Sequence, residues 1–109
     1  MSDLYEIEFT PSAESQIDDI VFYLENNESE SVADKVKRGI FDAVEGLIEM
    51  PHRHGIFRGV SDAEFTFRRV LKWSYIIVFY INEGNQTITI VDVSHSRQDP
   101  QKLIDRLSE

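Results

Sequence analysis

The chain has 109 residues, the size of one small domain with a single core of modest extent. Its hydrophobic content of 41% is typical of a globular protein, and the absence of cysteine excludes disulfides and cysteine-ligated metal sites. A formal net charge of -9 argues against a general nucleic-acid-coating protein, which would carry an excess of basic residues.

The first predicted element is a strand over residues 4–9. Tyr5, Ile7 and Phe9 alternate with two glutamates along this stretch. This period of two is typical of a strand that buries one face and exposes the other to solvent.

An amphipathic helix is predicted to follow the strand. Thr10 suits its N-cap, and Pro11 suits its first turn, where the missing N–H costs nothing. Apolar residues then recur at three- and four-residue spacing, which gives one buried stripe. The stripe consists of Ala13, Ile17, Ile20, Val21 and Leu24. Residues 25–28 break the pattern and predict a short loop.

A second helix is predicted to begin near Ser31, because Ser31 and Asp34 resemble a capping box. Pro51 disfavours helical geometry at Met50 and therefore marks the predicted end. The apolar stripe between these ends consists of Val32, Val36, Ile40, Ala43, Val44, Leu47 and Ile48. Since only a short loop joins the two helices, we expect them to pack as an antiparallel hairpin.

Three strands are predicted after a loop over residues 51–63. Residues 64–72 alternate as the first strand, and residues 74–81 are apolar on both faces, which predicts a central, covered strand. Residues 87–95 form the third strand. On the first of these strands Phe65, Phe67, Arg69 and Leu71 face one way, and Thr66, Arg68, Val70 and Lys72 face the other.

A short helix completes the predicted order. Asp99 and Pro100 begin it, and Leu103, Ile104 and Leu107 face inward. The fold class is therefore α+β: an N-terminal strand, a two-helix antiparallel hairpin, a three-stranded antiparallel meander and a short C-terminal helix, in one domain over residues 1–109. No segment is predicted to target or span a membrane, and we expect a cytoplasmic protein.

The charge is distributed unevenly along the chain. Residues 1–50 hold 13 acids and 3 bases, whereas residues 51–82 hold 5 bases and 2 acids. The bases of the second segment are Arg53, Arg58, Arg68, Arg69 and Lys72. This asymmetry predicts two functional surfaces of opposite sign.

Several stretches, taken in order, carry a resemblance to a known family. They are the opening strand with "TPSAESQIDDIVFYL", the helix end "IEMPHRHG", the strands "RRV" and "YIIVFY", and the closing "VSHSRQDP". The chain resembles the ParE/RelE superfamily, the toxin halves of bacterial toxin–antitoxin pairs. ParE-like members commonly end their last strand in His-x-Arg followed by Asp-Pro. His95, Arg97, Asp99 and Pro100 match that ending.

The resemblance implies a cytoplasmic toxin of a plasmid-stabilisation type, neutralised by a cognate antitoxin protein. ParE-like toxins bind and poison DNA gyrase, which implies a protein-docking surface with no catalytic residue, no cofactor, no metal and only indirect contact with nucleic acid. RelE-like toxins instead cleave mRNA on the ribosome, which requires a base, a proton donor and cations against the phosphate. A third alternative is an inactive member that only binds its antitoxin. The acidic balance favours it, because many such toxins are basic.

Two departures from the RelE-like pattern favour gyrase binding. RelE-like toxins typically carry Tyr-Arg in the central strand, whereas Tyr75 is followed here by Ile76. They also often offer a tyrosine in the terminal helix, and residues 101–109 contain none. The expected target-binding residues are Arg68, Arg69, Lys72, Trp73, His95 and Arg97.

Each of these residues also has a structural interpretation. Arg97 would pair with Asp92 or Asp99, and His95 would be a structural hydrogen-bonding residue on the face of Thr89, Val91 and Val93. Trp73 would pack beside the strand turn instead of stacking on a base, and packing is also the preferred role of Tyr75. His52 and His54 lack the further ligands of a metal site and are expected in an exposed loop.

Overall fold

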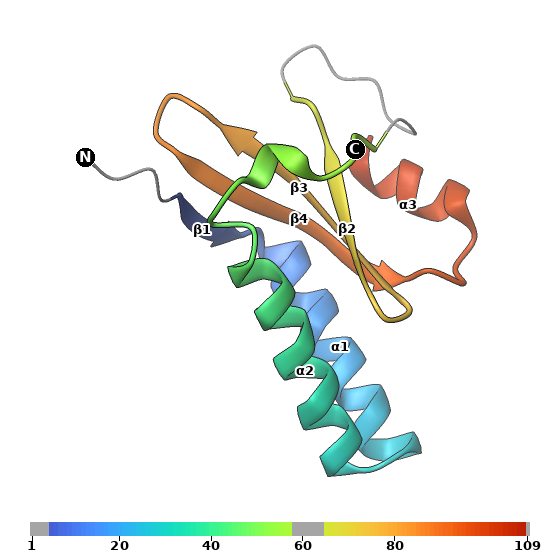
Figure 1. Cartoon of the computed structure of the whole chain (residues 1–109). Coiled ribbons are helices and arrows are strands. Elements are labelled where there is room, and N and C mark those ends of the chain that lie inside the picture. Colours follow the sequence, from blue (N-terminus) through green and yellow to red (C-terminus); the bar gives the residue numbers. More distant parts are fainter. Residues whose placement is uncertain (1–4, 58–64, 109) are drawn as a thin grey trace.

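The elements of the computed structural model, which describes residues 5–57 and 65–108, follow the predicted order (Figure 1). They are β1 (Glu6–Phe9), α1 (Pro11–Asn27), α2 (Glu30–Glu45), the 3-10 turn η1 (Pro51–Arg53), β2 (Arg68–Lys72), β3 (Tyr75–Asn82), β4 (Thr87–His95) and α3 (Pro100–Leu107). The sheet order is β1-β4-β3-β2, with β1 parallel to β4 and the other neighbours antiparallel. The predicted α+β fold is confirmed.

The helical hairpin owes its two starts to side-chain caps. The Thr10 hydroxyl accepts a hydrogen bond from the Ala13 N–H at 3.1 Å, as predicted. The second cap is Ser29, whose hydroxyl accepts from the Val32 N–H at 3.1 Å. The predicted capping box at Ser31 is therefore wrong, because a serine two residues earlier already satisfies the first free N–H groups of α2.

The cap assignment gives a direct stability test. Ser29→Ala is expected to lower the free energy of unfolding by about 1 kcal/mol, because it removes the hydroxyl that caps the start of α2. Ser31→Ala is the matched control and is expected to change it by less than about 0.5 kcal/mol. Urea denaturation of the two variants measures the difference. A larger loss from Ser31→Ala would restore the predicted capping box.

The end of α1 lies later than predicted. Residues 25–27 continue the helix, and the Asn26 and Asn27 side-chain amides donate to the carbonyls of Phe22 and Tyr23 at 2.7 and 2.9 Å. Because these amides bond to the preceding turn, the polar stretch that predicted a loop instead extends the helix.

The end of α2 lies earlier than predicted, at Glu45. The N–H groups of Leu47 and Ile48 bond to carbonyls three residues back, so the chain tightens into turns. Met50 then adopts a left-handed φ of 57°, in keeping with the expected exclusion of helical geometry before proline.

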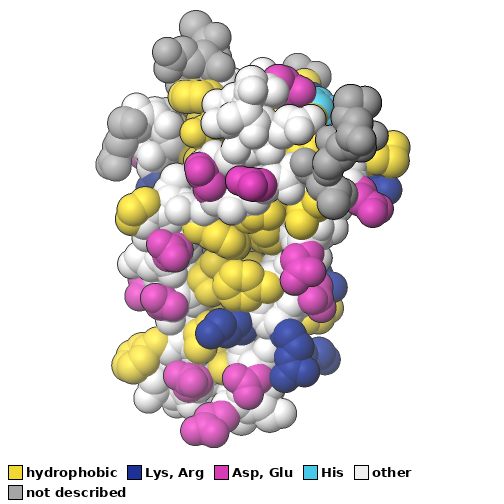
Figure 2. Space-filling view, turned by 90° about the vertical axis from the view of Figure 1, so that its left-hand side faces the viewer, with side chains coloured by type: hydrophobic (Ala, Val, Ile, Leu, Met, Phe, Trp, Pro, Cys, Tyr) yellow, Lys and Arg dark blue, Asp and Glu magenta, His cyan; other side chains and the backbone are white. Residues whose placement is uncertain are grey.

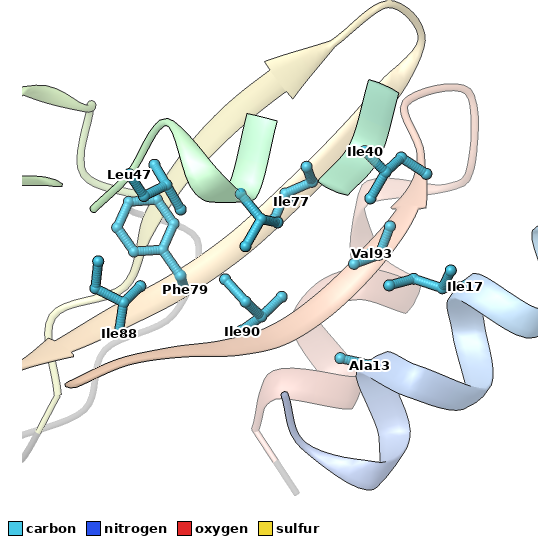
Figure 3. Packing of buried hydrophobic residues seen from close by; sticks show 10 residues of the cluster. Ala13, Ile17, Ile40, Leu47, Ile77, Phe79, Ile88, Ile90 and Val93 are labelled. Carbon is cyan, nitrogen blue, oxygen red and sulfur yellow. The ribbon is translucent and has the colours of Figure 1, made fainter. Parts of the chain in front are cut away.

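The main core lies between the helical hairpin and one face of the sheet (Figure 3). Its fully buried members are Ala13, Ile17, Ile40, Val44, Leu47, Ile77, Phe79, Ile88, Ile90 and Val93. The predicted stripe of α2 needs one correction, because Val32 is 37% exposed and Ala33 is buried in its place. Burying these side chains is the main force that holds the helices on the sheet.

A second, smaller core lies on the opposite face of the sheet. Phe67, Val78 and Leu103 are buried there, and Phe65 and Leu107 pack against them. Leu103 faces inward as predicted, and through it this cluster holds α3 against the sheet. Within residues 5–57 and 65–108, no helix is long and apolar enough to cross a membrane.

The predicted strand over residues 64–72 is shorter than expected. Its first residue lies outside the described residues, and pairing with β3 begins at Arg68. Phe65 turns instead to the second core, where its ring lies 4.2 Å from that of Tyr80, centroid to centroid.

A bulge in β4 changes which residues share a face. Val78 pairs with Asp92 and Phe79 pairs with Ile90, so Val91 is an extra residue in the ladder. Asp92 consequently shares the face of its partner Val78, on the side of the second core. The expected alternation of Thr89, Val91, Val93 and His95 on one face is wrong, because the extra residue reverses the alternation between Val91 and Val93.

Candidate functional site

The last residues of β2 and β4 and the first residue of β3 lie at one end of the sheet. Lys72 of β2 pairs with Tyr75 of β3, and Tyr75 pairs with His95 of β4. The Tyr75 and His95 rings lie edge to face, with centroids 5.3 Å apart. Together with Trp73 in the β2–β3 turn and Arg97 beyond β4, these residues form what we call the sheet-end surface.

The helices extend beyond this end of the sheet (Figure 1). Two aromatic residues of α1, Phe22 and Tyr23, are 68% and 63% exposed on the projecting part. Tyr23 is close enough to Tyr75 to influence the titration of its hydroxyl. The sheet-end surface therefore lies beside an exposed stretch of helix, in a position open to a macromolecular partner.

Arg97 is exposed and has a free side chain. Its backbone N–H donates to His95 Nδ1 at 3.0 Å, but its guanidinium bonds to no other described residue. The ion pair of Arg97 with Asp92 or Asp99, considered as an alternative from the sequence, is absent among the described residues. Asp92 binds Arg106, and Asp99 accepts from the N–H of Gln101 as the cap of α3.

The same hydrogen bond determines the tautomer of neutral His95. Because Nδ1 accepts from the Arg97 N–H, the ring proton of the neutral imidazole lies on Nε2. Burial, and secondarily the neighbouring Tyr23, raise the pKa of the Tyr75 hydroxyl. Neutral His95 in this tautomer and Tyr75 at neutral pH are thus hydrogen-bond donors, and neither presents a free base.

Trp73 adopts an unusual backbone conformation in the turn. Its φ of 51° lies in the left-handed region, where a bulky side chain costs on the order of 1 kcal/mol. Its ring is nevertheless 53% exposed. The ammonium groups of Lys72 and Lys35 lie 4.7 and 5.8 Å from the ring centroid, within the range of cation–π attraction.

Gly39 of α2 makes room for the Trp73 ring. A Cβ added to Gly39 would lie 2.3 Å from Cζ3 and 2.4 Å from Cη2 of the indole. Glycine inside a helix costs about 1 kcal/mol relative to alanine, so this close approach has a cost in helix stability.

The two remaining candidates lie elsewhere. Arg68 donates to the backbone carbonyls of His52 and His54 at 3.1 and 2.8 Å and so holds the η1 loop against β2. Arg69 is exposed on the opposite face of the sheet, next to Leu71. Arg68 and Arg69 pair with Phe79 and Val78, three or more residues from the end of the sheet at Tyr75, so neither arginine belongs to the sheet-end surface.

The His52 and His54 side chains do not form a metal site. His52 contacts the Glu83 carboxylate, and the His54 ring packs edge-on against Phe79 at 6.0 Å. Burial, then the charges of Arg53 and Arg68, lower the pKa of His54. Over the described residues, no group of three or more His, Asp and Glu side chains could hold a metal ion.

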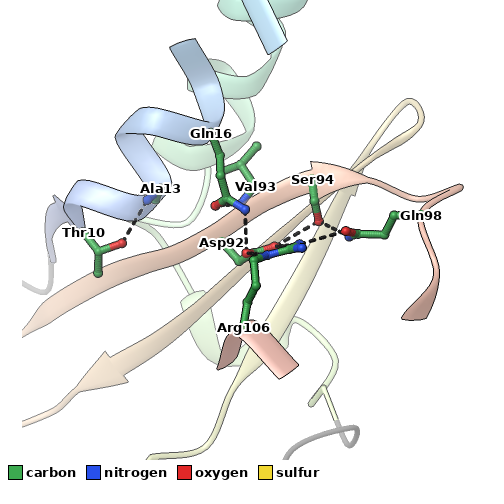
Figure 4. A network of polar contacts seen from close by, with 8 residues as sticks. All are labelled: Thr10, Ala13, Gln16, Asp92, Val93, Ser94, Gln98 and Arg106. Carbon is green, nitrogen blue, oxygen red and sulfur yellow. Dashed lines mark hydrogen bonds and ion pairs between the residues drawn. The ribbon is translucent and has the colours of Figure 1, made fainter. Parts of the chain in front are cut away.

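A buried polar network stabilises the strand that leads to the sheet-end surface (Figure 4). Asp92, 2% exposed, accepts from Arg106 Nε at 2.9 Å, from Gln16 at 2.7 Å and from the Ser94 hydroxyl at 2.9 Å. Gln98 accepts from Arg106 at 2.8 Å. The network thus joins α1, β4, the chain after β4 and α3, and it holds the segment that carries Arg97.

Three solved structures share this fold. The chromosomal ParDE TA system from P. aeruginosa gives a TM-score of 0.67 at 17% identity, over 86% of this chain and 98% of that chain. The archaeal RelE–RelB complex from Pyrococcus horikoshii OT3 gives a TM-score of 0.60 at 9% identity, over 88% of this chain and 99% of that chain. The toxin–antitoxin complex RelBE2 from Mycobacterium tuberculosis gives 0.54 at 19% identity, over 84% and 98%. No curated protein sequence matches the chain.

The sequence also matches a family model, described as the ParE toxin of the type II toxin–antitoxin system parDE. The match covers residues 7–100, from the first strand to the start of α3. It includes the helical hairpin, all of the sheet except the first residue of β1, and the strand end with His95 and Arg97. Because it spans most of the chain and the fold agrees, the chain belongs to the ParE toxin family of type II toxin–antitoxin systems.

Proposed function

We propose that this toxin inhibits DNA gyrase by binding to it through the sheet-end surface, without chemistry of its own. The observation that carries the proposal is the exposed guanidinium of Arg97, which bonds to no other described residue and follows His95, the last member of the row of Lys72, Tyr75 and His95. An exposed arginine next to half-buried aromatic rings is the composition of a protein-docking hot spot. Membership of the ParE family supports gyrase as the target.

The alternative function is mRNA cleavage on the ribosome. One observation favours it, since Tyr75 and His95 lie together with cationic Lys72 and Arg97 nearby. Cleavage at neutral pH needs a group that removes a proton from the ribose hydroxyl. The raised pKa of Tyr75 and the Nε2–H tautomer of neutral His95 leave this role unfilled, which supports binding as the main function.

We also propose that a cognate antitoxin covers part of the toxin. Figure 2 shows hydrophobic side chains gathered across the middle of one face, over the upper part of the helical pair, with acidic side chains on both sides. Phe9 and Phe41 pack edge to face at 5.6 Å and are only partly buried. The RelE–RelB and RelBE2 structures are complexes, which supports a protein partner for such an apolar face.

The target is tested with the purified chain in two parallel assays. Added to gyrase and relaxed plasmid, it is expected to inhibit supercoiling and to leave cleaved plasmid, whereas cell-free translation of a preformed mRNA stays unchanged. Loss of translation with normal supercoiling would establish the nuclease alternative instead. If neither assay responds and expression does not slow growth, the chain is an inactive member that binds only its antitoxin.

A further inference from the structure

The fold maintains the hollow around Trp73 at a cost in stability. The two-residue turn between β2 and β3 holds Trp73 at a left-handed φ, and the position of its indole requires the absence of a side chain at Gly39, yet Trp73 remains half-exposed. Neither feature is needed for a buried core residue. Strain that persists at an exposed aromatic side chain points to recognition of a partner.

The charges around this ring are also unusual for the chain. The first 50 residues contain only three bases, Lys35, Lys37 and Arg38, and all of them lie on α2. Lys35 and Arg38 line the hollow together with Lys72. An otherwise acidic protein therefore places three of its cations, with Asp34 and Asp42 between them, around its exposed indole.

We propose that this hollow binds an acidic peptide segment of a protein partner, with one apolar side chain of the segment placed on the Trp73 ring. Carboxylates of the segment pair with Lys35, Arg38 and Lys72, which replaces the weak cation–π contacts by charge-assisted hydrogen bonds. The inference rests on the proposed docking function and names the chemistry of the partner segment.

The acids in the same hollow favour a peptide over a nucleic acid. Asp34 and Asp42 alternate with the bases on the rim. A peptide offers backbone N–H groups that donate hydrogen bonds to these carboxylates, whereas the phosphodiester groups of a nucleic acid carry no such donors.

The test uses the fluorescence of Trp73, the only tryptophan in the chain. The intact protein is titrated with a tryptophan-free peptide that carries one phenylalanine among glutamates. A saturable change in the fluorescence of Trp73 is expected with this peptide. No change is expected with the same peptide in which lysines replace the glutamates. The double variant Lys35→Gln/Lys72→Gln is expected to weaken binding at least about tenfold. Lys37→Gln is the matched control, since Lys37 does not line this hollow, and is expected to alter it by less than about twofold.

Gly39→Ala tests the indole position separately. The added Cβ would displace the Trp73 ring, so the emission of the free protein is expected to shift and peptide binding to be lost. Circular dichroism is expected to show a folded protein, because alanine favours the helix.

Three outcomes would overturn the inference: no response to the acidic peptide, an equal loss in Lys37→Gln, or saturable binding of single-stranded oligothymidylate in preference to the peptide. The supercoiling assay separates this inference from the proposed function. Peptide binding without gyrase inhibition refutes only the function, and gyrase inhibition without peptide binding refutes only the inference.

Discussion

Arg106→Leu is expected to destabilise the protein by about 3 kcal/mol, because it removes the cation from a buried carboxylate. Asp92 is 2% exposed, and Arg106 is its ion-pair partner among the described residues. Breaking a buried pair by removing one partner typically costs roughly 3–5 kcal/mol, and the 36% exposure of the Arg106 side chain places this case at the lower end. Leucine keeps most of the apolar part of the arginine side chain.

Urea denaturation of a set of variants measures the change in the free energy of unfolding. The midpoint temperature of thermal unfolding is also expected to fall by roughly 10–20 °C for Arg106→Leu. Lys102→Leu is the matched control, an exposed base on the same helix, and is expected to change stability by less than about 0.5 kcal/mol. Asp92→Asn is expected to cost less than Arg106→Leu, because the freed arginine can turn to solvent. The double variant Asp92→Asn/Arg106→Leu is expected to lose less stability than the two single variants added together, by at least about 1 kcal/mol. Strict additivity would mean that the two side chains do not depend on each other.

This network shows where local sequence patterns stop being informative. Gln16 and Asp92 are 76 positions apart, and no spacing rule connects them. One signal was available, because Asp92 lies between two valines in a predicted strand, and a buried carboxylate requires partners. That signal predicts that partners exist, but their identity depends on the tertiary fold.

The helices and strands were predictable because their determinants are local. Thr10 and Pro11 start α1, and Asp99 and Pro100 start α3, where the sequence places them. The strand over residues 87–95 has the predicted bounds. The error at Ser31 also has a local cause, because Ser29 caps α2 two residues earlier.

The facing of His95 was not predictable from the strand pattern. One bulge residue, Val91, reverses the alternation, so His95 shares its face with Ile90 and Val93. The position of a bulge depends on how the strand pairs with its neighbour, and the alternation of residues within one strand does not predict it.

The candidate site divides in the same way. One end of the sheet holds Lys72, Trp73, His95 and Arg97, because the β2–β3 turn and the end of β4 lie at that same end. Gly39 was a visible signal that the predictions did not use, since an isolated glycine inside a helical pattern usually has a packing reason. Its partner, more than 30 residues later, could be identified only from the folded chain.

Arg97→Ala is expected to abolish toxicity while leaving the fold intact. Its guanidinium bonds to no other described residue, and its contact with His95 uses the backbone N–H, which alanine retains. The free energy of unfolding should therefore change by less than about 0.5 kcal/mol. The concentration that inhibits supercoiling should rise at least about tenfold, the effect of losing a hot-spot arginine.

Arg69→Ala is the matched control for Arg97→Ala, because it removes the same exposed side chain from the opposite face of the sheet. Retained gyrase inhibition in Arg69→Ala together with its loss in Arg97→Ala assigns the contact to the end of the sheet. Equal losses would instead assign it to the basic strand as a whole, and the row of Lys72, Tyr75 and His95 would no longer be the relevant geometry. A large stability loss in Arg97→Ala would show a structural arginine, and the exposed guanidinium would then not explain toxicity.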